Sequence, residues 1–288
     1  MNRFSISKIL LPTDFSDRCI GALRYAKLLA DHFQSEITLL HVMPAITEEP
    51  VPDFGGAILS RLLDARRAEA QKQLECLPCP GLEEHNVRRV MLEGDPAETI
   101  VDMAHSEHFD LIILATHGRG LFRRLLLGSV SSKVLHDADC PVWTGIHMEE
   151  AGARGPISLR RILCATDLTP ASAKIVNWAA GIAGEFQSEL HLIHVIPKFE
   201  TSAEAEHLRR HVEDAARKKM ENFHESCGIQ AQLVLESGEI PRAVTGAAKR
   251  LNADLLVIGR SPQTGALGRL RANAYAIIRE SPCPVVSV

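Results

Sequence analysis

The chain has 288 residues, of which 45% are hydrophobic and 24% are charged, and its formal net charge at pH 7 is −4. This composition suits one or two domains with a buried core, and the negative charge argues against nucleic acid as a partner. No apolar stretch approaches the roughly 18–20 residues that span a bilayer, and the N-terminus runs straight into a strand pattern without a leader pattern. We therefore expect a cytoplasmic protein that contacts neither nucleic acid nor a membrane.

Short runs of β-branched residues and leucine recur along the chain, separated by segments with helical spacing. They predict strands near residues 8–12, 37–42, 87–93, 111–115 and 141–145, and then near 161–165, 189–195, 230–236, 255–259 and 284–288. Apolar runs that alternate with helices are typical of a parallel sheet covered on both faces. Ser16 is expected to cap the first helix, and Pro96 and Pro241 to lie near the first position of later helices.

The second half of the chain repeats the first. The matching segments are Lys8-Ile-Leu-Leu-Pro-Thr-Asp14 with Arg161-Ile-Leu-Cys-Ala-Thr-Asp167, Phe33-Gln-Ser-Glu36 with Phe186-Gln-Ser-Glu189, His41-Val-Met-Pro44 with His194-Val-Ile-Pro197, and Cys140-Pro-Val with Cys283-Pro-Val. The repeat predicts two homologous α/β domains, residues 1–148 and 158–288, joined by a linker over residues 149–157. Their last strands would be exposed edges, which proteins normally pair or cover.

Residues 115–130 are the most informative stretch for function. They follow the apolar run Asp110-Leu-Ile-Ile-Leu114, contain Gly118 and Gly128, and lead into a helical pattern from Val130 to His136. Glycines let backbone N–H groups approach an anion, and the N–H groups at a helix start have no partner within the helix. Ser129 can add its hydroxyl, either as the N-cap or directly to an oxyanion. The segment predicts a phosphate-binding loop, with a tight turn and a capped helix as the alternative.

In a doubly wound sheet, ligands bind beyond the carboxyl ends of the strands, where the winding direction reverses. That places Thr13 and Asp14, after the first strand, opposite the loop after the fourth strand. Asp14 is a candidate acceptor for a ribose hydroxyl or an adenine amine, although an aspartate there can also cap the first helix. His117 can donate to phosphate or form part of a turn. Arg119, Arg123 and Arg124 can screen phosphate charge, the last two being equally suited to a solvated face.

These motifs resemble the universal stress protein family, and the resemblance covers essentially the whole chain. Nucleotide-binding members carry G-x2-G-x9-G-[ST] after the fourth strand; here Gly118, nine residues and Gly128-Ser129 match, whereas Ala115 replaces the first glycine. The resemblance implies two Rossmann-like domains of the adenine nucleotide alpha hydrolase type, each with a five-stranded parallel sheet of order 3-2-1-4-5. It also implies ATP or another adenine nucleotide, with a bridging Mg²⁺ or Mn²⁺. The contacts that the resemblance implies are Pro12, Thr13, Asp14, Val42, Gly118, Gly128, Ser129 and Val130, and the loop itself adds Ala115, His117 and Arg119 as candidates. In the family the last strands of two domains meet, so we expect the last strands of the two halves to pair within this one chain.

The second repeat departs from this pattern. Gly259 is kept, but Pro262 replaces the second glycine and Ala272-Asn273 replaces the closing Gly-Ser. Proline removes a backbone donor and fixes φ, both of which oppose a phosphate-binding loop. Because Asp167 still ends the first strand of this repeat, a nucleoside fragment or a different ligand stays open. We expect the ATP site in the N-terminal domain alone.

Three functions fit these features. The first is an ATP-binding stress-response protein in which the nucleotide acts as a regulatory ligand. The second is a relative that works through protein contacts without nucleotide, and the third is a slow ATP hydrolase. No carboxylate lies in the phosphate loop to orient water and no Lys-[ST] follows Gly128, so we assign no catalytic residue and expect at most weak ATPase activity.

The remaining candidates concern assembly, metals and thiols. Edge strands make self-association and a homodimer plausible, and a protein partner is expected but not identified. His207 and His211 lie four apart on a predicted helix and could share a metal, although an exposed basic face fits better without a third ligand. Cys76 and Cys79 form one C-x-x-C where a helix should end, and Cys164 fits a core position. No metal-binding residue is assigned.

Overall fold

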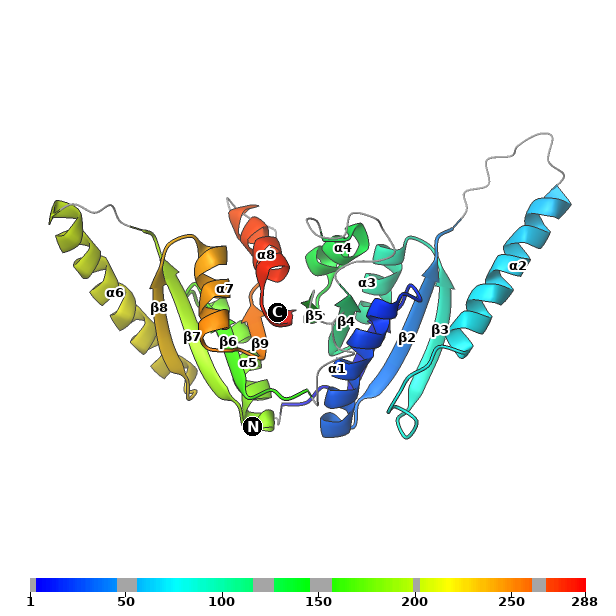
Figure 1. The fold of residues 1–288 in the computed structure, drawn as a ribbon, viewed down its shortest axis with the longest axis horizontal. Coiled ribbons are helices and arrows are strands. Elements are labelled where there is room, and N and C mark those ends of the chain that lie inside the picture. The colour runs from blue at the N-terminus through cyan, green and yellow to red at the C-terminus, as the bar shows by residue number, and fades with distance from the viewer. Residues whose placement is uncertain (1–3, 46–55, 116–126, 146–156, 199–202, 261–267) are drawn as a thin grey trace. The chain divides into compact units, whose positions relative to one another are not determined.

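A computed structural model describes residues 4–45, 56–115, 127–145, 157–198, 203–260 and 268–288 (Figure 1). Among these, one compact unit contains residues 6–45, 56–115 and 128–140. The other unit contains residues 4–5, 127, 141–145, 157–198, 203–260 and 268–288. No helix in the described part of the chain combines the length and apolar character needed to cross a membrane.

The first unit alternates strands and helices. Its elements are β1 (Lys8–Pro12), α1 (Asp17–Phe33), β2 (Glu36–Met43), α2 (Gly56–Glu75), β3 (Val87–Glu93), α3 (Pro96–Ser106), β4 (Leu111–Ala115) and α4 (Ser129–Asp137). The strands are parallel and lie in the order β3-β2-β1-β4. The central strands β1 and β4 are buried almost throughout, because helices cover both faces of the sheet.

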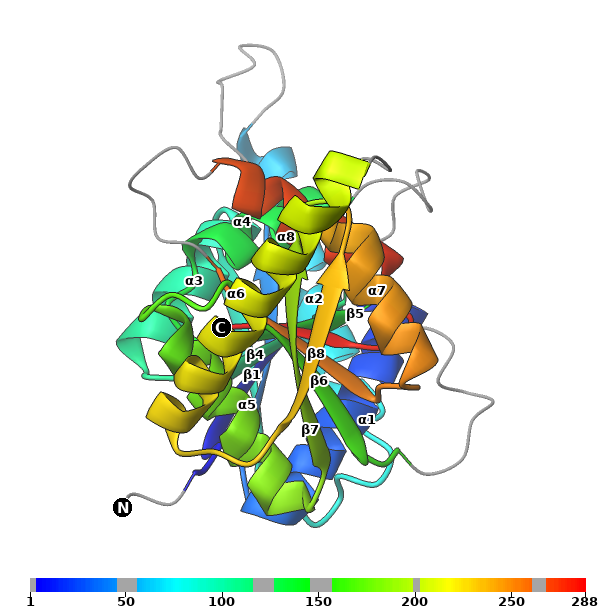
Figure 2. The same cartoon turned by 90° about the vertical axis from the view of Figure 1, so that its left-hand side faces the viewer.

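The second unit repeats this order and adds two strands, β5 before it and β10 after it. Its elements are β5 (Val142–Gly145), β6 (Arg161–Ala165), α5 (Ser172–Phe186), β7 (Glu189–Ile196), α6 (Ala203–Cys227), β8 (Gln232–Ser237), α7 (Ile240–Arg250), β9 (Leu255–Ile258), α8 (Gly268–Glu280) and β10 (Val285–Ser287). Strands β8-β7-β6-β9-β10 are parallel in that order. Figure 2 shows α5 and α6 on one side of β6, β7 and β8, and α7 on the other.

Strand β5 pairs antiparallel with β10. Val142, Trp143 and Thr144 lie opposite Ser287, Val286 and Val285, respectively. The expected pairing of the two final strands within one chain is therefore confirmed. Trp143 is completely buried, so this pairing contributes a large side chain to the core of the second unit.

The Phe-Gln-Ser-Glu repeat marks the same helix ending in both units. Gln34 and Gln187 are the C-caps of α1 and α5 in the left-handed conformation, with φ of 60° and 53°. The next residue, Ser35 or Ser188, donates its hydroxyl at 2.5 Å to the backbone carbonyl of Ile6 or Leu159. The motif thus ends a helix and fastens the chain to the segment before the first strand.

Three expected helix starts can be compared with the structure. Pro96 begins α3, and Pro241 is the second residue of α7, as expected. Ser16 is the N-cap of α1, but its side chain makes no capping hydrogen bond. The turn is instead closed by Asp14, which accepts from the Ser16 backbone N–H at 3.0 Å, so the expected capping by the serine hydroxyl is wrong.

One buried histidine makes the stability of the second unit depend on pH. His191 of β7 is 5% exposed, and neither ring nitrogen has a hydrogen-bond partner among the described residues. Burial lowers its pKa, the Glu189 carboxylate opposes this, and Arg161 adds to it. Because the folded pKa lies below the unfolded value, unfolding takes up a proton at acidic pH. The free energy of unfolding should be constant above pH of about 6.5 and fall as the pH drops below it.

The first repeat supplies a matched replacement for His191. The equivalent residue is Thr38, whose Oγ1 accepts from Arg88 Nε at 3.2 Å. We expect His191→Thr to flatten the acid side of the stability profile, measured by urea unfolding at several pH values between 7.5 and 5.5. Parallel profiles for the two proteins would contradict this role of His191.

Candidate functional site

The loop after β1 holds Thr13 and Asp14 in a fixed turn. Thr13 is buried, and its N–H donates to the carbonyl of Leu40 at 2.8 Å. Its Oγ1 accepts from the N–H of Phe15 at 3.1 Å, and Asp14 Oδ1 accepts from the N–H of Ser16 at 3.0 Å. The turn-closing role of Asp14 is therefore present.

Phe15 and His41 support this loop, although neither was predicted as a site residue. Phe15 has φ of 61°, a left-handed conformation that non-glycine residues rarely adopt and that often marks functional sites. The Nδ1–H of His41 donates to the Thr13 carbonyl at 2.9 Å, and its ring lies 4.1 Å from the Phe15 ring, centroid to centroid. The recurrence of His-Val-x-Pro in both repeats was the available signal.

The end of β4 and the start of α4 form the other side of the site. Ala115 ends β4, and its carbonyl accepts from the hydroxyl of Ser131 at 3.0 Å. Gly128, with φ of −57° and ψ of 147°, is the N-cap of α4, and Ser129 is the first helical residue. The Gly128 carbonyl accepts from the Ser132 N–H at 2.8 Å. The N-cap of α4 is therefore Gly128, and the alternative that Ser129 is the N-cap is wrong. Ser129 is exposed in the first turn of the helix.

The parallel strands bring most of the predicted residues to the end of the sheet where their carboxyl termini lie. Strand β1 lies between β2 and β4, so the carboxyl ends of the three parallel strands meet there. This end of the sheet carries Pro12, Thr13, Asp14, Val42, Ala115, Gly128, Ser129 and Val130. His117, Gly118 and Arg119, as well as Arg123 and Arg124, lie outside the described residues.

The loop after β6 reproduces the first loop. Thr166 Oγ1 accepts from the N–H of Leu168 at 3.0 Å, and Leu168 has φ of 60°. The Nδ1–H of His194 donates to the carbonyl of Thr166 at 2.9 Å. Both loops therefore have a left-handed residue at the same position, Phe15 or Leu168, and the same histidine hydrogen bond to the threonine carbonyl.

Asp167 accepts three hydrogen bonds from residues that follow it in the chain. Its Oδ1 accepts from the N–H and the hydroxyl of Thr169, at 3.0 and 2.7 Å, and from the hydroxyl of Ser172. Burial raises the pKa of Asp167, but these hydrogen bonds outweigh it and hold the pKa below its usual value. The carboxylate is therefore ionised at neutral pH.

At the end of the fourth strand the first repeat has Ala115 and the second has Gly259, and packing explains this difference. A Cβ added to Gly259 would lie 2.3 Å from Cδ1 of Ile175 on α5. In the first repeat the equivalent residues are Ala115 and Ala22. Ala22 on α1 is smaller than Ile175 on α5, so an alanine can be accommodated at position 115.

Two of the cysteines and the histidine pair lie in different environments. Burial raises the pKa of Cys79, whose sulfur lies 3.4 Å from Nη2 of Arg89, and Cys164 is completely buried. His207 and His211 are exposed on α6 with ring centroids 6.1 Å apart. Within the described residues, no group of three or more His, Cys, Asp or Glu side chains is placed to hold a metal ion.

Comparisons with known proteins agree with this architecture. A sequence model of the universal stress protein family matches residues 5–144 and again residues 158–288. A universal stress protein of Methanocaldococcus jannaschii is 36% identical over 138 residues, which cover 47% of this chain and 79% of the relative. One from Thermus aquaticus is 35% identical over 136 residues, covering 46% and 94%. A solved universal stress protein from Archaeoglobus fulgidus shares the fold over 99% of this chain and 97% of its own, with a TM-score of 0.66 and 23% identity.

Proposed function

The chain belongs to the universal stress protein family, and from this premise we propose that it is a regulatory ATP-binding protein whose N-terminal domain holds the nucleotide. The difference between the two repeats after the fourth strand carries this proposal. The first repeat keeps Gly118 and Gly128-Ser129, whereas the second has Pro262 and Ala272-Asn273.

The start of α4 supplies the chemistry for phosphate. Gly128 is the N-cap and has no side chain, so the N–H groups of the first turn are accessible from the strand edge. These groups carry the positive end of the helix dipole, and the exposed hydroxyl of Ser129 adds a donor beside them. The turn around Asp14 lies at the end of the adjacent β1 and would receive the ribose or adenine. A Mg²⁺ or Mn²⁺ ion would be held chiefly by the phosphate oxygens.

The nucleotide would act as a ligand rather than as a substrate. Its phosphates would contact the loop after β4, and its nucleoside the loop after β1, so binding would favour one arrangement of the two loops. A ligand shifts such an equilibrium by its difference in affinity for the two states. This gives the bound and free forms different surfaces for a protein partner.

Matched aspartate variants test which domain holds ATP. We expect Asp14→Ala to weaken ATP binding about tenfold or more, because a hydrogen bond to a charged group contributes roughly 1.5–3 kcal/mol. Asp167→Ala should leave the affinity unchanged. Equilibrium dialysis with labelled ATP and Mg²⁺ measures both. In addition, Asp14→Asn keeps an acceptor for the Ser16 N–H and so separates loss of the turn from loss of the ligand bond.

Equal losses in the two alanine variants, or a loss confined to Asp167→Ala, would contradict the assignment to the N-terminal domain. Undetectable ATP binding by the unaltered protein would favour a family member that acts through protein contacts alone.

A further inference from the structure

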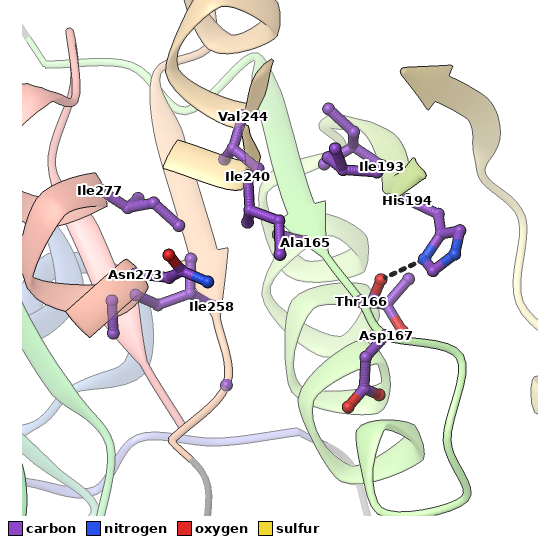
Figure 3. A pocket seen from close by; sticks show the side chains of 13 residues that line it. Ala165, Thr166, Asp167, Ile193, His194, Ile240, Val244, Ile258, Asn273 and Ile277 are labelled. Atoms are coloured by element: carbon purple, nitrogen blue, oxygen red, sulfur yellow. Dashed lines mark hydrogen bonds between the residues drawn. The ribbon is translucent and has the colours of Figure 1, made fainter. Parts of the chain in front are cut away.

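The second domain contains a cavity of about 130 Å³ at the carboxyl ends of its strands (Figure 3). Its walls are apolar and come from several elements: Ile193 of β7, Ile258 of β9, Ile240 and Val244 of α7, and Ile277 of α8. An engineered apolar cavity of similar size, about 150 Å³, accepts a benzene ring. The cavity thus has room for a ring or a short branched chain.

Ile240 indicates that the cavity is built for an apolar guest. Its side chain is 41% exposed at the start of α7, although it lines the cavity. The equivalent residue of the first repeat is Pro96, the first residue of α3. When an apolar ligand covers a large, partly exposed aliphatic side chain, apolar surface is removed from water and the binding free energy becomes more favourable.

Asp167 gives the cavity one charged group. It lines the cavity, and the three hydrogen bonds from Thr169 and Ser172 all end on Oδ1. We therefore assign Oδ2 to the ligand. The ionised carboxylate of Asp167 attracts a cation and repels a phosphate. In the sequence, Pro262 replaces the glycine of the first repeat and therefore has no N–H to donate.

We propose that this cavity binds a small organic amine, whose apolar body lies against the isoleucines and whose ammonium group donates to Asp167. The site selects against phosphorylated molecules, in contrast to the site proposed in the first domain. It does not depend on ATP binding, because its residues belong to the second repeat alone. Asn273 lines the same cavity and can orient a further polar group of the ligand.

Two probes of the same shape and opposite charge test this site. In the full chain with labelled isoleucine methyl groups, benzylamine should give saturable NMR shifts of Ile240, Ile258 and Ile277. Ile112 of β4, in the first unit, is the internal reference and should not shift. Benzylphosphonate, which has the same ring and a negative group, should produce no saturable shift at the same residues.

Asp167→Asn provides the matched variant. Asparagine keeps an acceptor for Thr169 and Ser172, so the loop can stay folded, while the charge is lost. We expect the dissociation constant for benzylamine to rise about tenfold, consistent with loss of a charged hydrogen bond. Glu239→Gln removes the same charge from the exposed N-cap of α7, beside Ile240, and should change it less than about twofold.

Three outcomes would overturn the proposal: no saturable shift with benzylamine, comparable shifts with benzylphosphonate, or unchanged binding in Asp167→Asn. None of them depends on whether ATP binds. A failure here is therefore distinguishable from a failure of the proposed function.

Discussion

Giving the first domain the residues of the second, by Gly118→Pro, Gly128→Ala and Ser129→Asn together, should reduce ATP affinity about a hundredfold or more. Proline removes one backbone donor and fixes φ, and the change at Ser129 replaces its hydroxyl with a larger amide. Each lost hydrogen bond to a charged phosphate oxygen contributes roughly 1.5–3 kcal/mol, so two of them account for this loss. Calorimetric titration with ATP and Mg²⁺ measures the affinity.

The control for this exchange is Pro262→Gly in the second domain, which should leave ATP affinity unchanged. Thermal unfolding of the triple variant shows whether it is still folded. If the folded triple variant bound ATP as tightly as the unaltered protein, the glycine-bearing loop after β4 would not be the phosphate site.

The second large effect concerns the pairing of β5 with β10. Trp143 is completely buried, lies opposite Val286, and belongs to the compact unit of the second repeat. We expect Trp143→Ala to lower the free energy of unfolding by about 3–5 kcal/mol, because truncation removes buried apolar surface and leaves a cavity. Urea unfolding followed by circular dichroism measures this change.

The adjacent residue provides a control on the same strand. Thr144 is also completely buried, and its Oγ1 has no hydrogen-bond partner among the described residues. Thr144→Val should therefore be neutral or stabilising, since it removes an unsatisfied polar group at nearly constant shape. A loss from Trp143→Ala no larger than the change in Thr144→Val would contradict the role of β5 in this core.

The strands were predictable because their signal is local. The bounds expected for β1, β3, β4 and β6 are those of the structure. Strands β1, β4 and β6 are short, largely apolar runs that end at a loop, whereas β3 also contains Arg88 and Arg89. Strand β8 begins at Gln232 rather than near residue 230, because α6 ends at Cys227 and Gly228 turns the chain with φ of 62°. The pairing of β5 with β10 was expected from the resemblance to the family, because the repeat by itself indicates only that both final strands are exposed edges.

The candidate site was predictable only in part. Residue types and spacing identified Thr13, Asp14 and the glycine-bearing loop, which are local features. His41 was not predicted, because its bond to the Thr13 carbonyl joins two neighbouring strands. Another unpredicted feature is a pair of residues in contact: Gly259 faces Ile175 in the second repeat, and the equivalent residues of the first repeat are Ala115 and Ala22. This difference depends on how a helix packs against the end of a strand. Such contacts arise from tertiary structure and leave little trace in one sequence.

The number of ATP molecules bound per chain tests the account most directly. Calorimetric titration of the unaltered full chain with ATP and Mg²⁺ should give one equivalent, because only the first repeat keeps Gly118 and Gly128-Ser129, the residues that we propose to bind phosphate. Two equivalents would show that the second repeat still holds a triphosphate, and none would show that the loop around Gly128 does not bind one; either result would contradict the account.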